Sequence, residues 1–267
     1  MKAAPFDFVR ATALSDVFAA FERHGDDARI VAGGQSLMPM MNMRLAAPRV
    51  LVDINHIAEL NGVSETDGTL RIGALTRHQE LGVNALVAEH APLLTMASTH
   101  IAHPAIRNRG TFGGSLSHAD PAADYPAAVV GLGATVHTNA RTIAADDFFT
   151  GLLETALNDG EIITAVSFPV PDKAAYQKFG NPASRYAIVG VMLSSGSAGV
   201  RVAITGAGPC VFRQGDMEKA LAGSFSADAV TGVTVSADGL NSDIHASDKY
   251  RAHLVGVMAK RAVAACA

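Results

Sequence analysis

The sequence predicts a protein of mixed helices and strands whose character changes near residue 171. Three observations support this. Strand, helix and strand patterns alternate before about residue 55, with a helix expected in "SDVFAAFERHG" and strands in "ARIVAGG" and "PRVLVDI". Pro169 and Pro171 interrupt the chain after a strand pattern rich in β-branched residues. Beyond them, "AYQKFG", "RYAIVGVMLSS" and "GVRVAITGAG" read as successive strands joined by short turns, which indicates an antiparallel sheet.

The middle of the chain alternates further. A strand is expected in "GTLRIGAL", and Thr76 with Gln79 forms a capping-box pattern that predicts a helix through about Glu89. Helices follow in "APLLTMASTHIA" and "AADYPAAVVGLG", and strands in "ATVHT" and "EIITAVSFPV". The C-terminal stretch predicts a helix capped by Ser247.

Composition argues against nucleic acid as the main partner of this chain. The 267 residues are 49% hydrophobic and only 17% charged, with a net charge of -4. Such a chain can bury a sizeable core, but it lacks the basic surface needed to neutralise nucleic-acid phosphates. The mean hydropathy of +0.21 suggests that partner subunits cover part of the surface.

The sequence predicts no membrane segment, no signal peptide and no cysteine-bound cluster. No apolar stretch reaches the ~20 residues needed to span a bilayer, and "MKAAPFDFVR" is not a signal peptide. Cys210 and Cys266 are too few to ligate an iron–sulfur cluster, which needs about four thiolates. Two free thiols indicate a cytoplasmic protein.

Two motifs with adjacent glycines carry the strongest chemical signal: "VAGGQSL" at 31–37 and "TFGGSLSHADPAAD" at 111–124. A Gly-Gly pair permits positive φ and removes side chains, so consecutive amides can point at one anion such as a pyrophosphate. The hydroxyls of Ser36, Thr111 and Ser115 can add hydrogen bonds. Asp124 only accepts hydrogen bonds, which suits polyol hydroxyls. Two amide nests and a polyol acceptor fit a dinucleotide that carries a sugar alcohol, as FAD does.

Other interpretations of these residues stay open or are disfavoured. A Gly-Gly pair can be a simple turn, and neither motif matches the G-x-G-x-x-G or Walker A pattern. Arg107 and Arg109 could reach a phosphate or could anchor the loop through its carbonyls. The spacing of His100, His103 and His118 lacks a carboxylate set of known metal geometry, so no metal site is expected.

Three stretches together resemble one family: "VAGGQSLMPMMNMRL", "HPAIRNRGTFGGSLSHADPAADYP" and "IHASDKYRAHLVGVMAKRA". It is the medium, FAD-binding subunit of molybdenum hydroxylases, namely aerobic carbon monoxide dehydrogenase and its xanthine dehydrogenase-like relatives. The resemblance covers essentially the whole chain, with both glycine motifs in the right order and at the right separation. Many relatives have "TIGGN" for "TFGGS", and often a histidine where this chain has Gln35; each replacement keeps a side chain that can hydrogen-bond.

The resemblance implies an α+β fold in two parts. Residues 1–170 would form an FAD-binding domain of the vanillyl-alcohol oxidase or PCMH type, with subdomains of about 1–55 and 56–170. Residues 171–267 would form a C-terminal α+β domain, a small antiparallel sheet with helices that closes over the flavin.

The resemblance also implies the site residues. The first pyrophosphate loop would be Ala32, Gly33, Gly34, Gln35, Ser36 and Leu37, and the second Gly110, Thr111, Gly113, Gly114 and Ser115. Asp124 would bind the ribityl or phosphate-proximal part of FAD, with His118 and Asp120 on the same loop. Apolar or aromatic contacts to the rings would come from Ile106, Ile163 and Tyr186, and Lys178 would lie near the isoalloxazine.

The implied function is electron transfer within an assembly. FAD would be held noncovalently and would receive electrons from the [2Fe–2S] clusters of a small subunit, while a large subunit carries the molybdopterin. The chain would pass the electrons to an external acceptor, in a dimer of heterotrimers in the cytoplasm. Two alternatives differ in kind: a non-catalytic assembly or scaffold protein for a molybdenum enzyme, and a stand-alone flavin oxidoreductase.

Overall fold

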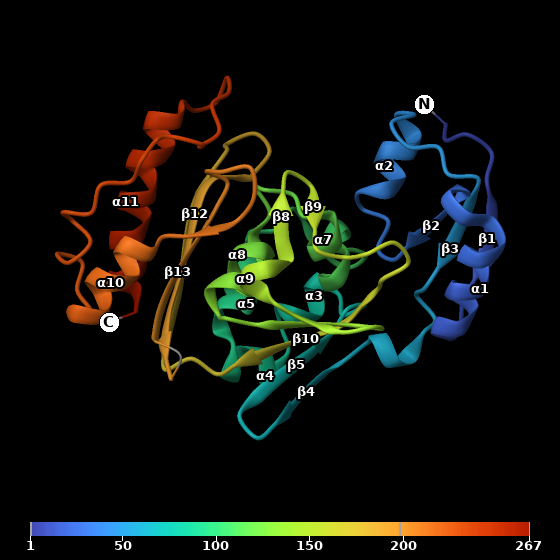
Figure 1. Cartoon of the computed structure of the whole chain (residues 1–267), viewed down its shortest axis with the longest axis horizontal. Coiled ribbons are helices and arrows are strands. Elements are labelled where there is room, and N and C mark those ends of the chain that lie inside the picture. The colour runs from blue at the N-terminus through green and yellow to red at the C-terminus, as the bar shows by residue number, and fades with distance from the viewer. Residues whose placement is uncertain (1, 198, 267) are drawn as a thin grey trace.

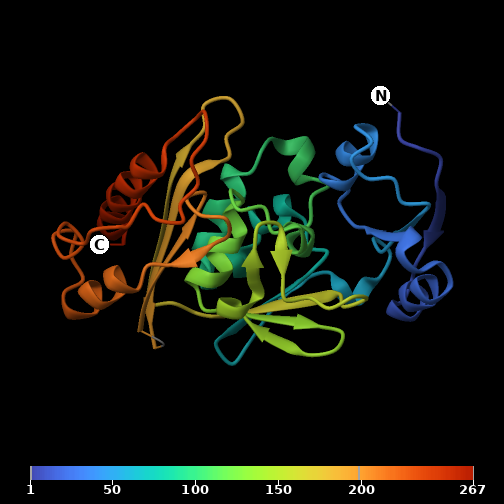
Figure 2. The ribbon, with the colours of Figure 1, turned by 45° about the horizontal axis from the view of Figure 1, so that its top comes forward.

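Within the described residues, the chain forms three larger β-sheets in succession and a two-stranded sheet, β8-β9, with helices packed between and around them (Figure 1). The structure is a computed structural model that describes residues 2–197 and 199–266. The same order from the N-terminal to the C-terminal sheet is visible in the tilted view (Figure 2). The expected α+β class is confirmed. No helix of the described residues combines the length and apolar character needed to cross a bilayer.

The first sheet is small and parallel, with strand order β1-β3-β2. Helix α1 connects β1 to β2, as the β–α–β pattern predicts, and packs Val17 and Ala20 against Val50 and Val52 of the central strand. The polar turn after β2 then leads into the short helix α2. The bounds of these elements are β1 Asp7–Arg10, α1 Leu14–His24, the 3-10 turn η1 Gly25–Asp27, β2 Ala28–Val31, α2 Leu37–Asn42 and β3 Val50–Asp53.

The second sheet is antiparallel throughout, with strand order β4-β5-β10-β6-β7. Its core contains fully buried aromatic side chains, among them Phe112, Tyr125 and Phe168. The elements of this unit are η2 Ala58–Leu60, β4 Val63–Thr66, β5 Thr69–Gly73, α3 His78–Leu81, α4 Ala85–His90, α5 Pro92–His100, α6 Pro104–Arg107, α7 Phe112–His118, α8 Asp124–Gly131, β6 Thr135–Thr138, β7 Thr142–Ala144, α9 Ala145–Phe148, β8 Phe149–Gly151, β9 Glu154–Thr155 and β10 Ile163–Pro169.

The single helix expected from Thr76 to about Glu89 is wrong. Two short helices, α3 and α4, replace it, and the side chain of Asn84 caps α4 by accepting hydrogen bonds from the amides of Leu86 and Val87. The buried Thr76 caps neither helix because its hydroxyl donates to the carbonyl of Gly62, 3.1 Å away. A tertiary contact therefore takes the side chain that the capping-box pattern assigned to a local role.

The third sheet is antiparallel, as predicted, with strand order β11-β12-β13-β14. It is covered on both faces: α11 and α10 lie outside, and α8 packs on the inner side against β12 and β13 (Figures 1 and 2). Strand β12 is consequently buried from Ala187 to Ser194 without alternation. Ser247 caps α11 as expected, accepting from the amide of Tyr250. The bounds are β11 Lys173–Gly180, β12 Ala187–Gly196, β13 Gly199–Thr205, β14 Phe212–Arg213, α10 Gly215–Gly223 and α11 Asp248–Ala265.

Candidate functional site

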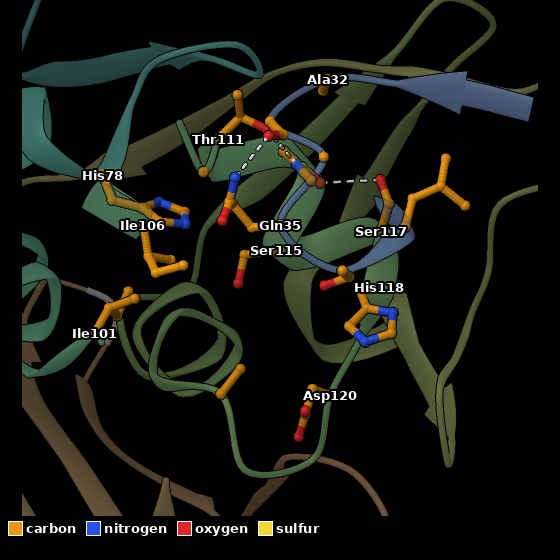
Figure 3. Close-up of a pocket in the computed structure, with 18 of the residues that line it drawn as sticks. Ala32, Gln35, His78, Ile101, Ile106, Thr111, Ser115, Ser117, His118 and Asp120 are labelled. Carbon is orange, nitrogen blue, oxygen red and sulfur yellow. Dashed lines mark hydrogen bonds between the residues drawn. The ribbon is translucent and has the colours of Figure 1, made fainter. Parts of the chain in front are cut away.

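One cavity of about 670 Å³ receives residues from each of the three larger sheets, among them Ile30 of β2, Ile163 of β10 and Lys178 of β11. Its size is in the range of small-molecule and cofactor sites. All the residues predicted to bind the cofactor line it: Ala32, Gly33, Gly34, Gln35, Ser36, Leu37, Ile106, Gly110, Thr111, Gly113, Gly114, Ser115, His118, Asp120, Asp124, Ile163, Lys178 and Tyr186. The close-up shows Gln35, Ser115 and His118, which come from two separate segments, facing the same space (Figure 3).

The two glycine motifs touch each other at the cavity wall. A Cβ added to Gly33 would lie 2.7 Å from Cα of Gly110 and closer still to the carbonyl oxygen of Arg109. The main chain of the first motif therefore packs directly on the main chain that enters the second. Glycine is required at position 33 by this close approach, since its φ is not positive.

The first motif presents unused amides. Within residues 2–197 and 199–266, the main-chain N–H groups of 33–37 donate to no protein acceptor. Gly34 has a φ of +72°, a conformation that glycine adopts without strain, and it turns the chain from β2 into α2. The side-chain amide of Gln35 braces the turn by donating to the carbonyl of Gly33, 3.2 Å away. A run of free amides at such a turn is an anion-binding nest.

The second motif is built differently from the expected amide nest. Gly113 and Gly114 lie in the first turn of α7 and have no positive φ. The amides of Phe112, Gly113 and Gly114 donate to Thr76, Ala74 and the side chain of Thr111, respectively. The expectation of a second nest is wrong because the segment after strand β5 and the helix cap already use these donors.

The glycines of the second motif serve close packing instead. A Cβ on Gly113 would lie 2.6 Å from Cβ of Ala74, and one on Gly114 would lie 2.6 Å from Oγ1 of Thr111. The hydroxyl of Ser115 remains without a protein partner among the described residues and faces the cavity (Figure 3). The motif thus offers the hydroxyl of Ser115 and the exposed main chain of Gly114 rather than a cluster of amides.

Replacing Thr111 by valine is expected to lower the free energy of unfolding by about 1 kcal/mol. Oγ1 of Thr111 accepts from the Gly114 amide at 3.2 Å and is the side-chain cap of α7, so its loss leaves a donor unpaired. Urea titration of the full chain measures the change. Thr111→Ser keeps the hydroxyl and should stay close to the wild type; equal losses for both variants would contradict a capping role.

Asp124 and Lys178, which line another part of the cavity, form a buried polar triad with Tyr176 behind them. Nζ of Lys178 lies 2.8 Å from Oδ1 of Asp124, and both side chains are about 5% exposed or less. The hydroxyl of Tyr176 donates to the same carboxylate. Burial, and then the charge of Asp124, raise the pKa of Tyr176 well above its usual value, so the phenol stays protonated and donates. Asp124 and Lys178, predicted to have separate roles, are therefore direct partners.

Tyr176 is a residue that the sequence analysis missed. It lies two positions before Lys178 in β11, so both side chains leave the strand on the same face. That spacing is the signal that could have identified it. By contrast, the predicted Tyr186 lies at the cavity edge with 52% of its surface exposed.

Arg107 anchors a loop. Its Nη1 donates to the carbonyl of Ile101, 2.9 Å away. This contact favours a role in anchoring the loop over a contact with phosphate. The side chain of Arg109 is exposed, while its carbonyl accepts a hydrogen bond from Arg77.

His78 is a second missed residue of the cavity wall. Its ring fills the space beside Gly110, where an added Cβ would lie 2.6 Å from the imidazole. It packs on Tyr125 with ring centroids 5.2 Å apart, and its Nδ1 has no hydrogen-bond partner among the described residues. Burial, assisted by the charges of Arg77 and Arg107, lowers the pKa of His78 to about 4. The imidazole is therefore neutral near pH 7.

This histidine is expected to reduce the free energy of unfolding by about 2 kcal/mol as the pH falls from 7 to 5. In the unfolded chain its pKa is that of an ordinary histidine, 6.5, whereas in the folded chain it is about 4, so protons favour unfolding in this window. Urea titrations at both pH values measure the effect. His78→Gln should remove this part of the pH dependence, and an unchanged slope in that variant would contradict it.

Comparison with known proteins gives a consistent answer. The sequence model of the family described as "FAD binding domain in molybdopterin dehydrogenase" matches residues 4–171. The chain is 35% identical to the 6-hydroxypseudooxynicotine dehydrogenase complex subunit alpha of Paenarthrobacter nicotinovorans, over 99% of this chain and 95% of that protein. It is 33% identical to the carbon monoxide dehydrogenase medium chain of Hydrogenophaga pseudoflava, with 97% and 96% covered.

Solved structures agree with these relatives in fold. Reconstituted CO dehydrogenase from Oligotropha carboxidovorans contains a chain that superposes with a TM-score of 0.92 at 32% identity, covering 100% of this chain and 99% of that one. Quinoline 2-oxidoreductase from Pseudomonas putida 86 gives a TM-score of 0.89 at 31% identity, with 100% and 98% covered. The family match over residues 4–171 and the identity to relatives over most of the chain lead to one conclusion: this chain belongs to the family of FAD-binding domains in molybdopterin dehydrogenases.

Proposed function

We propose that the chain is the FAD-binding electron-transfer subunit of a molybdenum hydroxylase and that the cavity described above holds the cofactor. The observation that carries this proposal is the run of unused amides at 33–37, placed in a cavity of about 670 Å³. A diphosphate needs such donors, and the residues around them fit the rest of the molecule. FAD, when bound, supplies the redox chemistry by accepting and releasing electrons singly or in pairs.

The protein's contribution is to bind and orient the cofactor. The amides of 33–37 would hold the diphosphate, and the free hydroxyl of Ser115 would add a donor beside them. Ile106 and Ile163 would give apolar contact to the ring systems, with Tyr186 at the edge of the cavity. The Asp124–Lys178 pair would present a fixed polar group to the ribityl chain or the isoalloxazine.

The partners follow from the chemistry that this chain lacks. Its two cysteines cannot ligate a [2Fe–2S] cluster, which needs about four protein ligands. A small iron–sulfur subunit would therefore deliver electrons, and a large subunit would hold the molybdopterin. We extend the proposal to a dimer of heterotrimers in the cytoplasm that passes electrons to an external acceptor. The relatives' names, one a medium chain and one a complex subunit alpha, support an assembly of this kind.

The same proposal divides the chain into an FAD-binding domain, 1–170, with subdomains of about 1–55 and 56–170, and a C-terminal domain, 171–267. Two observations support the main boundary. Strand β10 ends at Pro169 and β11 begins at Lys173, and the family match ends at residue 171.

A titration of the full chain with FAD tests the function. Tight binding, with the visible absorption of protein-bound flavin and one FAD per chain, is the expected result. The chain is titrated alone and after copurification with its partner subunits, since these can complete the site. Absence of flavin in both preparations would contradict the proposal. Turnover of an electron donor by the isolated flavoprotein would instead favour a stand-alone oxidoreductase, and intact assembly without any bound flavin would favour a scaffold.

A further inference from the structure

Two side chains outside the cavity connect the two glycine motifs. Nδ2 of Asn55 donates to the carbonyl of Ala32 in the first motif, 2.8 Å away. Arg77 donates through Nη1 to the carbonyl of Arg109 at the entry to the second motif. Nη2 of Arg77 donates to Oδ1 of Asn55 at 2.6 Å, which joins the two contacts into one continuous chain of hydrogen bonds.

Asn55 and Arg77 are each held in place by a different unit of the fold. Asn55 follows β3 of the first sheet, and its amide donates to the side chain of Asp53 at 3.0 Å. The backbone of Arg77 forms an antiparallel bridge with Thr111 of the second motif. The Asn55–Arg77 hydrogen bond is therefore the joint between the two motifs: Asn55 is bonded to the first motif, and Arg77 is paired with the second.

The two units share an apolar cluster, to which Leu75 and Ile162 of the second unit contribute, but within the described part of the chain the two motifs make no direct polar contact with each other. Among the residues that the structure describes, no hydrogen bond runs directly between 31–37 and 106–115. The packing of Gly33 on Gly110 resists closer approach, because backbone atoms are already in contact, but it does not hold the two segments together. A directional polar connection supplies that restraint.

The chemistry of the joint requires these residue types. Asn55 must donate to one neighbour and accept from another, which a carboxylate cannot do. Arg77 reaches its two acceptors through two different nitrogens, Nη1 and Nη2, whose fixed separation in the planar guanidinium a lysine ammonium does not reproduce. Burial, followed by the charge of Arg109, lowers the pKa of Arg77, and the charge of Asp53 acts in the opposite direction.

We infer that Asn55 and Arg77 form a positioning clasp that sets the spacing of the two motifs and thereby the affinity for FAD. The inference rests on the proposed function and adds two residues to it. Neither side chain lines the cavity, so both act through the loops that they hold. The clasp couples the first sheet to the second at the point where the diphosphate is expected to bind.

A double-mutant cycle on the full chain tests the clasp, with FAD affinity measured by quenching of flavin fluorescence. Asn55→Ala and Arg77→Ala should each weaken FAD binding by at least about tenfold, since each removes the hydrogen bond that the charged Arg77 donates to Asn55. The double variant should be no weaker than the weaker single variant, because both break the same chain. Arg77→Lys should not restore affinity. Arg49→Ala, whose side chain is 81% exposed in the same unit, is the matched control and should bind like the wild type.

The readouts separate positioning from general stability. Titrations are run at a temperature at which circular dichroism shows every variant folded, and the absorption band of bound flavin should keep its wild-type shape. Wild-type affinity in a folded single variant, or strictly additive losses in the double variant, would overturn the clasp while leaving the proposed function intact. A band shape altered in proportion to the loss of affinity would also overturn it, because the flavin surroundings would then have loosened as a whole. A wild-type chain that binds no FAD, alone or with its partners, would refute the function itself.

Discussion

Replacing Gly33 by alanine is expected to weaken FAD binding by at least about a hundredfold, the largest effect on cofactor affinity that the structure predicts. The added Cβ would lie 2.7 Å from Cα of Gly110, and the carbonyl of Arg109 is nearer still. Both obstacles are backbone atoms, so no side-chain rotation can relieve the clash. The first motif must move away from the second, and its amides lose their place in the cavity. Equilibrium titration of the full chain with FAD measures the loss.

The control for this prediction is a glycine with open space around it. Gly256 lies within α11, and an added Cβ would meet nothing within 4 Å. Alanine at that position should leave FAD binding unchanged and should favour the helix slightly. If Gly33→Ala bound FAD as tightly as Gly256→Ala does, the contact between the two motifs would not matter for the cofactor.

Replacing Asp124 by asparagine is expected to lower the free energy of unfolding by about 3–5 kcal/mol. The change leaves the ammonium group of Lys178 buried, about 4% exposed, without its counter-charge. The hydroxyl of Tyr176 keeps an oxygen to donate to, so the loss reports mainly on the unpaired charge. Urea titration of the full chain without FAD measures it.

Two further variants define this second effect. Lys178→Met in the Asp124→Asn background should recover much of the stability, because the uncompensated charge is then gone. Asp216→Asn breaks the ion pair between Asp216 and Lys219, whose side chains are 71% and 82% exposed, and should cost less than about 1 kcal/mol. A loss at Asp124 as small as that at Asp216 would show that the pair is solvated.

The sequence was sufficient to predict most elements with strong local patterns. Alternation of strand and helix signals located the first sheet, and the change at Pro169 and Pro171 located the antiparallel one. Ser247 was recognisable as a cap because its partner, the amide of Tyr250, is three residues away. Such signals are local, so they need no knowledge of the tertiary structure.

The errors arise where tertiary contacts override local patterns. Thr76 looked like a helix cap, but its hydroxyl bonds to Gly62, which is distant in sequence. Gly113 and Gly114 looked like a bend because no local pattern reports that residues following β5 supply acceptors for their turn. The cavity lining was predicted from motif resemblance, whereas His78 and Tyr176 were missed because their roles depend on packing that no single motif encodes.

The position of α8 has a consequence for how the molecule can be divided. Every residue of this helix is buried, although by sequence it belongs to the segment that precedes the boundary, and it packs on β12 and β13 of the segment that follows. A fragment ending at residue 171 would expose the apolar face of α8 to water. Strands β12 and β13, expressed without α8, would likewise expose the face that the helix covers. The segments before and after residue 171 are therefore expected to fold together, because each buries apolar side chains of the other.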